Sequence, residues 1–401
     1  MKKLIRLLAV ALAVMMLAGC SLVTVNEEKI VVATVGDETI TKADFNEGFN
    51  ALLSQYGYTQ DSEAIADQLK TLKENYIAQM VEDKVLEKKI KELGLDQVTD
   101  EEKAAAEQEI QDWYDEQYAA LVENFKTDDT VEDPEAKAAE TIENYLSQYG
   151  LTLDQMKENS VASISSDKLY DYVTKDVTVT EEEAKIEFAN KVAAAKEKYD
   201  ADLSAYVSDF ENGATIYYTP KGCYYIKHIL ISLTDEQKQD IKNLRADDDE
   251  TVAATADEKR EEYLLTIREK AESVLKLVDE GGDFEALMEE YGEDTGMQNE
   301  PAKTNGYAVC EQSTNWVESF RDAAMALAKV GDVSEPVRSS YGIHLIKYVS
   351  DAVEGPVAFD DVKDTIYESL LSTKQDDAYN AAVDEWVAAA DAKVDRDALK
   401  D

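Results

Sequence analysis

Only two histidines occur in this chain of 401 residues, and both lie in short apolar segments that predict β-strands. His228 lies within residues 224–231, and His344 lies within residues 341–347. Because side chains alternate along a strand, each histidine shares a face with apolar neighbours. Imidazoles titrate near neutral pH, so such a pair is a candidate for proton or hydrogen-bond chemistry. The alternative is two histidines that only complete hydrogen bonds inside a sheet.

The region between the two histidines predicts the elements that would position them. A helical pattern over residues 263–278 stops at Gly281-Gly282, and Asp283 can cap a short helix that ends at Tyr291. A loop over residues 292–315 follows, and then a helix that begins near Trp316 and is ended by Gly331. The predicted order is strand, long helix, short helix, loop, helix, strand.

Five consecutive motifs in this region resemble those of the parvulin-type peptidyl-prolyl isomerases. They are, in order, residues 227–231 (KHILI), 283–287 (DFEAL), 320–324 (FRDAA), 330–337 (VGDVSEPV) and 341–347 (YGIHLIK). The resemblance implies a domain over residues 222–351 with a small antiparallel sheet surrounded by helices. It also implies cis–trans isomerisation of X–Pro peptide bonds.

The resemblance assigns a catalytic set residue by residue. His228 and His344 occupy the paired-histidine positions of the family, and Asp294 falls where the family has cysteine or aspartate. Ser339 falls where a hydroxyl residue completes the hydrogen-bond network. Rotation about an amide breaks no bond, so we expect neither a cofactor nor a metal.

The proline-binding set is less regular. Phe320 and Trp316 match positions that line the proline pocket, and Tyr341 lies beside it. Trp316 is bulkier than the methionine that is common there, and Asn305 replaces an apolar residue of the pocket. The loop before Gly306 also lacks the Gly-Gly-Asp-Leu sequence of the family. These departures leave the fold expectation intact and leave catalytic activity open.

The first residues predict export. Residues 1–19 combine a basic start with an apolar run over residues 7–17, which is short for a membrane span. The run ends in Leu-Ala-Gly before Cys20, which resembles the lipobox of bacterial lipoproteins. The resemblance implies a lipid on Cys20 and a location at the extracytoplasmic face of the bacterial cell membrane. The alternative is an ordinary secretory signal with an incidental cysteine.

Residues 20–219 predict a mostly helical domain. A short strand and turn over residues 31–40 precede a helix that Thr41 and Asp44 can open, and residues 32–45 resemble the N-terminal opening of the SurA/PrsA-type foldases. A long amphipathic helix is expected from Ile65 to about Gly94. Thr99 with Glu102 and Thr180 with Glu183 form two further helix-start signals.

Residues 352–401 return to a helical pattern whose apolar face is too short to be buried alone, so we expect this segment to dock on the N-terminal lobe. The expected class is α+β, with a helical chaperone lobe and an inserted parvulin domain.

The strongly negative net charge of the chain limits the kinds of molecule that it can bind. The chain has 86 acidic and 41 basic residues and a net charge of −45, which argues against nucleic acid and anionic lipid surfaces. The foldase resemblance implies that unfolded or partly folded secreted proteins are the clients. The sequence leaves open whether two copies form a homodimer, and whether Cys223 and Cys310 pair in an oxidising compartment.

The favoured interpretation is a lipid-anchored foldase with isomerase activity. A holdase whose isomerase domain is inactive is the alternative, favoured by Asn305 and the missing glycines. A solute-binding lipoprotein would require repeated βα units, which the pattern does not contain.

Overall fold

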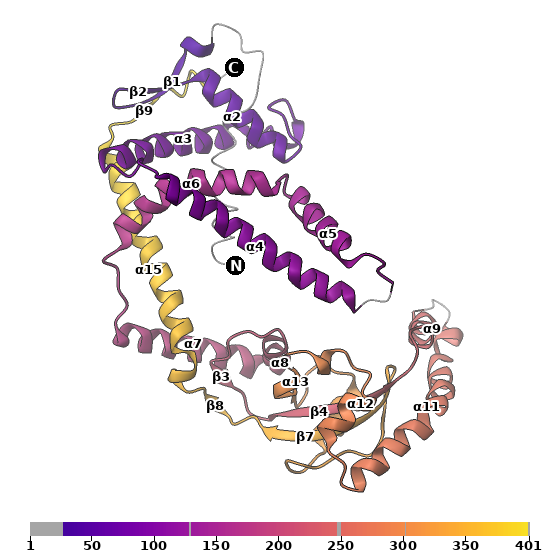
Figure 1. The fold of residues 1–401 in the computed structure, drawn as a ribbon. Helices are drawn as coiled ribbons and strands as arrows, with labels where there is room; N and C mark the ends of the chain where they lie inside the picture. Colours follow the sequence, from indigo (N-terminus) through magenta and orange to yellow (C-terminus); the bar gives the residue numbers. More distant parts are fainter. Residues whose placement is uncertain (1–26, 128–129, 247–249, 301, 400–401) are drawn as a thin grey trace. The chain divides into compact units, whose positions relative to one another are not determined.

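The computed structural model describes residues 27–399 except 128–129, 247–249 and 301 (Figure 1). The described residues divide into two units, the first made of residues up to Thr178 together with those from Ser372, and the second of Val179–Leu371. The expected signal peptide over residues 1–19 and the expected lipidation site at Cys20 lie outside the described residues.

The first unit combines a small sheet with long helices. Its elements are η2 (Glu27–Lys29), β1 (Val31–Val35), β2 (Glu38–Thr41), α2 (Lys42–Gln55), η3 (Glu63–Ile65), α3 (Leu69–Glu92), α4 (Asp100–Lys126), α5 (Pro134–Gln148), α6 (Leu153–Thr174) and β9 (Lys393–Val394). The strand order is β2-β1-β9, and both pairings are antiparallel. Helices α5 and α6 both pack against α4 (Figure 1).

The predicted helix starts are confirmed at Thr41, Thr99 and Thr180. In each case the threonine side chain accepts a hydrogen bond from the third residue of the helix, whose own side chain bonds back to the threonine N–H. The long helix predicted from Ile65 instead begins at Leu69. Ile65 belongs to the short 3-10 helix η3 and still buries its side chain in the core, so apolar spacing alone placed the start one turn too early.

The second unit holds the remaining elements and most of the strands. They are α7 (Glu181–Ala201), α8 (Leu203–Glu211), β3 (Tyr218–Thr219), β4 (Cys223–Ser232), α9 (Asp235–Arg245), α10 (Glu250–Ala253), α11 (Ala256–Asp279), α12 (Phe284–Tyr291), η4 (Gly296–Gln298), α13 (Ala302–Asn305), β5 (Tyr307–Cys310), α14 (Glu318–Met325), β6 (Val337–Arg338), β7 (Gly342–Asp351) and β8 (Gly355–Pro356). The division between the units falls within α15 (Phe359–Ala389).

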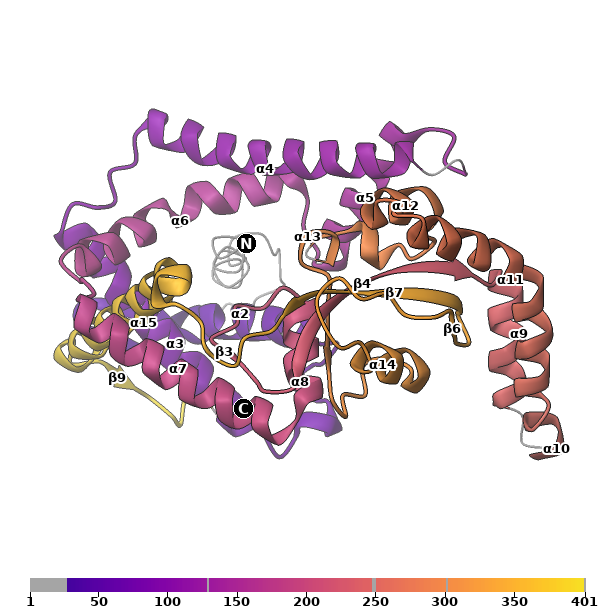
Figure 2. The ribbon, with the colours of Figure 1, turned by 90° about the horizontal axis from the view of Figure 1, so that it is seen from below.

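The main sheet of the second unit is antiparallel, with the strand order β5-β4-β7-β6. Helix α14 packs on one face of this sheet, and α12 lies on the other (Figure 2). The expected α+β class, with a small antiparallel sheet among helices, is confirmed.

The predicted loop over residues 292–315 is wrong in part, because it contains η4, α13 and the edge strand β5. Strand β5 pairs with the first part of β4, from Cys223 to Ile226. Four residues are too few to show a strand period, and their partner lies more than 80 positions earlier in the chain, so local pattern could not reveal them.

The contacts divide the chain after Thr178 and after Leu371, and the domain boundaries expected at residues 219–222 and 351–352 stay a prediction. Helices α7 and α8 belong to the second unit, where α8 packs on β5. The last part of the chain belongs to the first unit, where β9 pairs with β1 and Leu399 joins the core.

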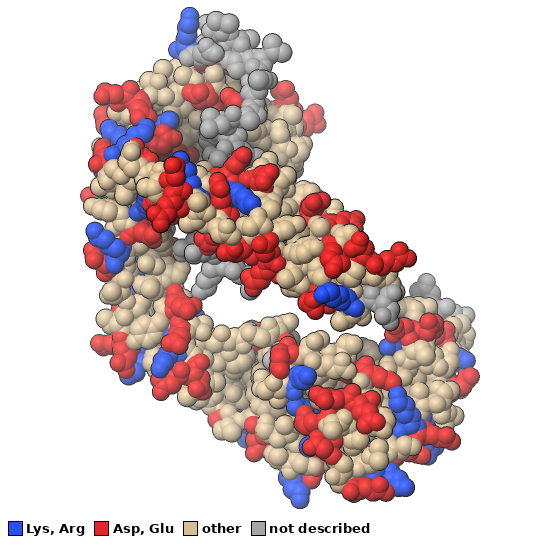
Figure 3. All heavy atoms as spheres, viewed as in Figure 1, with Lys and Arg blue, Asp and Glu red and all other residues tan. Residues whose placement is uncertain are grey.

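Acidic side chains are spread over the visible surface of each unit, with lysine and arginine scattered among them (Figure 3). Among the described residues, no helix is both long and apolar enough to span a membrane.

Candidate functional site

The pairing of β4 with β7 brings the two histidines together. Leu230 lies opposite His344, and His228 lies opposite Ile346, so the two imidazoles are diagonal neighbours on one face of the sheet. Their Nδ1 atoms are 3.1 Å apart, and the side chains are 3% and 4% exposed. The strand pairing thus places two histidines from distant segments of the chain on the same face of the sheet.

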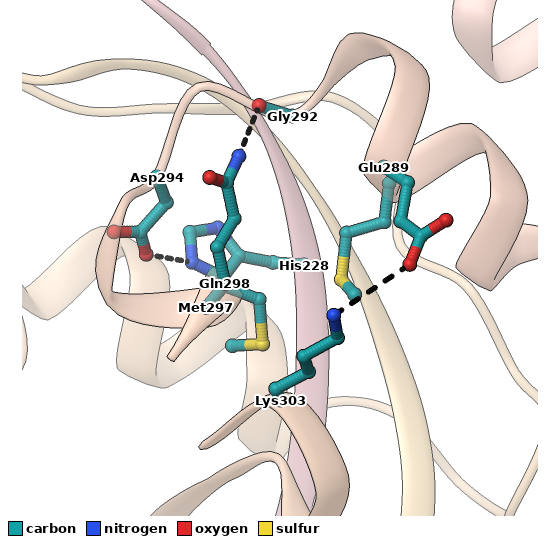
Figure 4. Close-up of a pocket in the computed structure, with 8 residues that line it drawn as sticks. His228, Glu289, Gly292, Asp294, Met297, Gln298 and Lys303 are labelled. Atoms are coloured by element: carbon teal, nitrogen blue, oxygen red, sulfur yellow. Dashed lines mark hydrogen bonds and ion pairs between the residues drawn. The ribbon is translucent and has the colours of Figure 1, made fainter. Parts of the chain in front are cut away.

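Asp294 reaches the histidines from the turn that follows α12. Strand β5 pairs only with the first part of β4, and the turn contacts a later part of β4. There the Glu293 N–H donates to the Leu230 carbonyl at 2.9 Å. One carboxylate oxygen of Asp294 then lies 2.6 Å from His228 Nε2 (Figure 4). The Asp294 side chain is 24% exposed, so part of its surface remains accessible from outside.

Three donors hold the Asp294 carboxylate. His228 Nε2 and the Tyr307 hydroxyl bind Oδ2, the hydroxyl at 3.1 Å, and the Gly296 N–H donates to Oδ1 at 3.0 Å. Burial by itself would raise the pKa of Asp294, but the hydrogen bonds from His228, Gly296 and Tyr307 outweigh it and hold the pKa below its ordinary value. Asp294 is therefore a partly buried group that stays ionised at neutral pH.

The hydrogen bonds continue through His344 to Ser339. His344 Nε2 is 2.7 Å from Ser339 Oγ, which accepts a hydrogen bond from the Tyr341 N–H at 3.0 Å. Burial and the neighbouring His228 lower the pKa of His344 to about 3, so this imidazole is neutral. One proton assignment satisfies every link: Ser339 donates to His344, His344 donates to His228, and His228 donates to Asp294.

Aromatic rings cover the histidine pair. The Phe320 ring centroid lies 5.1 Å from that of His228 and 5.0 Å from that of His344. The Trp316 ring centroid lies 5.7 Å from that of Phe320 and 4.6 Å from that of Tyr307. The Trp316 Nε1–H donates to the Ala308 carbonyl at 2.9 Å. Only 3% of Phe320 is exposed, so the ring expected to contact proline is enclosed by its neighbours.

A cavity of about 300 Å³ opens beside Asp294 and His228 (Figure 4). Its lining residues are His228, Met288, Glu289, Gly292, Asp294, Met297, Gln298 and Lys303. An ion pair between Lys303 and Glu289, with 3.9 Å between charged atoms, lies along its wall. Within the described part of the chain, no group of His, Cys, Asp and Glu is placed to hold a metal ion.

None of the four residues expected to bind proline lines this cavity. Trp316 and Phe320 lie together beside the histidines, whereas Tyr341 is 53% exposed next to Ser339 and Asn305 is exposed at the end of α13. Sequence reasoning missed Tyr307, which binds Asp294 directly. Its place after Gly306 carried no family motif, and only the pairing of β5 with β4 brings it to the site.

Two features fix β5 against β4. Cys223 and Cys310 lie opposite each other in the register and form a disulfide bond, which settles the pairing that the sequence left open. Gly306 has φ +80°, and a Cβ at this position would lie 2.4 Å from the Ile226 carbonyl oxygen. Only glycine allows the chain to enter β5 this close to β4.

Two family models match the chain. The SurA-like N-terminal domain matches residues 1–132, and the PPIC-type PPIASE domain matches residues 228–350. The second match begins at His228 and includes every residue of the candidate site described above.

Two curated relatives are named foldase protein PrsA. Foldase protein PrsA of Clostridium acetobutylicum is 27% identical over 383 residues, which cover 93% of this chain and 91% of that protein. Foldase protein PrsA of Clostridium botulinum is 25% identical, covering 98% of this chain and 97% of the relative. The crystal structure of PrsA from Bacillus subtilis matches with 21% identity and a TM-score of 0.23, covering 91% of this chain and 92% of that one. The chain thus contains one segment that matches a SurA-like N-terminal domain and one that matches a PPIC-type peptidyl-prolyl isomerase domain, and over most of its length it is similar to foldase proteins PrsA.

Proposed function

We propose that this protein is a lipid-anchored foldase that catalyses cis–trans isomerisation of X–Pro bonds in secreted proteins. The observation that carries the proposal is the continuous hydrogen-bond chain from Ser339 through both histidines to the ionised Asp294. This arrangement holds the Asp294 carboxylate against His228, whose ring centroid lies 5.1 Å from that of Phe320.

The reaction needs an environment that disfavours the planar amide. Resonance puts partial negative charge on the carbonyl oxygen and creates a barrier of about 18–20 kcal/mol to rotation. Rotation removes this resonance contribution and so lowers the negative charge on the oxygen. A carboxylate beside the oxygen therefore raises the energy of the planar amide more than that of the twisted one, which lowers the barrier. In our proposal the partly exposed carboxylate of Asp294 is the group that lies beside the substrate carbonyl oxygen.

The histidines act through Asp294 in this mechanism. His344 is neutral, so it holds the orientation of His228 without adding a positive charge that would cancel the charge of Asp294. Burial and the nearby Asp294 raise the pKa of Tyr307, which keeps its hydroxyl protonated as a donor. We assign positioning roles to His228, His344 and Ser339 accordingly.

Phe320 is proposed to hold the proline ring by apolar contact, as the matching position of the isomerase family implies, and Trp316 covers the approach to it. A peptide that reaches Phe320 has to displace Trp316 at least in part, because Phe320 is almost fully enclosed.

Replacing Trp316 with methionine is expected to raise kcat/KM several-fold, mainly through a lower KM. The smaller side chain opens the approach to Phe320, while the lost contacts and the lost hydrogen bond to Ala308 cost about 1–3 kcal/mol of stability. Steady-state exchange rates of a short X–Pro peptide measure the effect. Trp113→Met changes a half-buried tryptophan of the first unit in the same way and should leave kcat/KM unchanged. An unchanged or lower kcat/KM in a folded Trp316→Met protein would show that Trp316 does not obstruct the site.

The burial of Phe320 also favours a second candidate, a holdase whose isomerase domain only binds chains. Refolding of a client limited by X–Pro isomerisation separates the two functions, because the uncatalysed phase takes tens to hundreds of seconds. An isomerase shortens this phase at substoichiometric amounts. A holdase suppresses aggregation only near equimolar amounts and leaves the slow phase unchanged.

The proposed location is the extracytoplasmic face of the membrane, with unfolded secreted proteins as clients. Its support is the basic and apolar pattern of residues 1–19, followed by Cys20 in a lipobox-like sequence. The name foldase, shared by the curated relatives, agrees with such clients.

A further inference from the structure

Helix α8 lies before the residues that match the isomerase model, yet it covers the outer edge of the isomerase sheet. The matched residues begin at His228, whereas α8 ends at Glu211. Because β5 is the edge strand, its outward N–H groups need partners from outside the sheet. Helix α8 packs against this edge and supplies one of them.

Three polar residues of α8 face β5 and the segment that follows it. Ser204 Oγ accepts from the Thr314 N–H at 3.0 Å, and Ser208 Oγ accepts from the Asn315 side-chain amide at 2.8 Å. Glu211 Oε1 accepts from the Ala308 N–H at 2.9 Å. The three acceptors follow the helical spacing i, i+4 and i+7, so one stripe of α8 binds the chain from Ala308 to Asn315.

This chain segment leads directly into the candidate site. The Ala308 N–H donates to Glu211, and the Ala308 carbonyl accepts from the Trp316 Nε1–H. Its neighbour Tyr307 donates its hydroxyl to Asp294. A shift of β5 at Ala308 would therefore move both the ring that covers Phe320 and a donor that holds Asp294.

Glu211 also brings a charge close to the site. Among the described residues, no lysine or arginine forms an ion pair with it, and the titratable groups that interact with it are Asp294 and Tyr307. Burial raises the pKa of Glu211 to about 7, although the Ala308 N–H lowers it and the negative Asp294 raises it further. Glu211 therefore changes charge in the neutral range.

We propose that Glu211 is a positioning residue of the isomerase site, which anchors β5 through Ala308 and, when ionised, strengthens the negative potential at Asp294. The inference rests on the proposed isomerase function, and it extends the functional isomerase unit to residue 203. A stronger negative potential at the substrate carbonyl favours the twisted amide, so ionised Glu211 is the more active form.

The pH profile of kcat/KM for an Ala–Pro peptide, measured on the full chain between pH 5.5 and 8.5, tests the proposal. In the wild type we expect kcat/KM to rise several-fold through a step near pH 7. Glu211→Gln keeps an acceptor for the Ala308 N–H but carries no charge, so its profile should lack the step and stay near the low-pH level of the wild type. His228 and His344 are present in both proteins, so the difference between the profiles isolates Glu211.

Asp209→Asn is the matched control on the same helix. Asp209 binds Lys198 at 2.6 Å and the Tyr199 hydroxyl at 2.8 Å, on the side of α7 rather than β5. Its profile should keep the step. A step that persists in Glu211→Gln would overturn the proposal, as would a drop of equal size at every pH, which indicates a purely structural role.

Thermal unfolding gives a readout that does not depend on catalysis. A carboxyl group whose pKa is raised by folding contributes stability below its unfolded pKa of about 4.3, and this stability is lost as the pH rises through the folded pKa near 7. The Tm of Glu211→Gln minus the Tm of the wild type should therefore grow by several degrees as the pH rises from 5 to 8. A constant Tm difference would contradict the buried, titrating carboxyl on which the proposal depends.

The failure of this inference differs from the failure of the proposed function. A wild type that accelerates exchange without a step near pH 7 removes the role of Glu211 and leaves the isomerase intact. A wild type that accelerates exchange at no pH removes the isomerase function itself, and with it the positioning role of Glu211.

Discussion

Replacing Asp294 with asparagine is expected to lower kcat/KM for X–Pro exchange by on the order of 10²-fold, the size of loss that follows removal of one aligned electrostatic group. Asparagine keeps the shape of the side chain and an acceptor oxygen for His228. It removes the charge that disfavours the planar amide. Exchange spectroscopy by NMR on a short X–Pro peptide measures the rate.

The control for this change is Asp279→Asn, which removes the same charge at an exposed position near the end of α11. Its kcat/KM should match the wild type. If Asp294→Asn stays folded and retains activity within a few-fold of the wild type, the charge of Asp294 is not the source of catalysis. The site would then act through shape and apolar contact alone.

Loss of the disulfide bond is expected to have the largest effect on stability. Cys223 and Cys310 are 87 positions apart, and a cross-link that closes a loop of this length restricts the unfolded chain by about 4–5 kcal/mol in the chain-entropy model. The double change of both cysteines to alanine should therefore lower the free energy of unfolding by about this amount. Urea unfolding followed by circular dichroism measures it, and the midpoint should fall without a smaller m-value.

Reduction of the wild-type protein is the matched comparison, because it breaks the same bond and keeps both sulfur atoms. The reduced wild type and the double variant should unfold at similar urea concentrations. A loss below about 1 kcal/mol in both would mean that the loop is already restricted in the unfolded state, against the entropic account.

Local sequence patterns predicted the strands that carry His228 and His344 and the caps of several helices. His228 and His344 were expected on one face of their strands, and the antiparallel pairing of β4 with β7 joins these two faces. The family motifs also placed Asp294 and Ser339 at positions that lie within hydrogen-bond distance of the histidines. Asp294 and Ser339 were thus assigned by the resemblance to the isomerase family and not by local pattern.

The remaining parts depend on contacts between distant segments. Tyr307 reaches Asp294 only because β5 pairs with β4, and Glu211 reaches Ala308 only because α8 covers that edge. Neither pairing has a local signal. The enclosure of Phe320 follows from the packing of Trp316 and Tyr307, which the sequence indicated only through the size of the tryptophan.

The division of the chain was also beyond local pattern. Helix α7 begins with the expected capping threonine, but its sequence does not tell which core it joins. In the structure its end packs with α8 and β5 around Tyr199 and Tyr206. A boundary drawn at Pro220 therefore separates two helices from the sheet that they cover.

The most direct test of the central claim is cis–trans exchange of short X–Pro peptides, measured by NMR with the wild-type protein and with glutamate, lysine or leucine before proline. If the protein is an isomerase with the site described here, substoichiometric amounts will accelerate exchange of at least one peptide well above the uncatalysed rate, which has a time constant of tens to hundreds of seconds. The folded wild type leaving all three rates unchanged would contradict the account, and the protein would then be a holdase whose isomerase domain only binds.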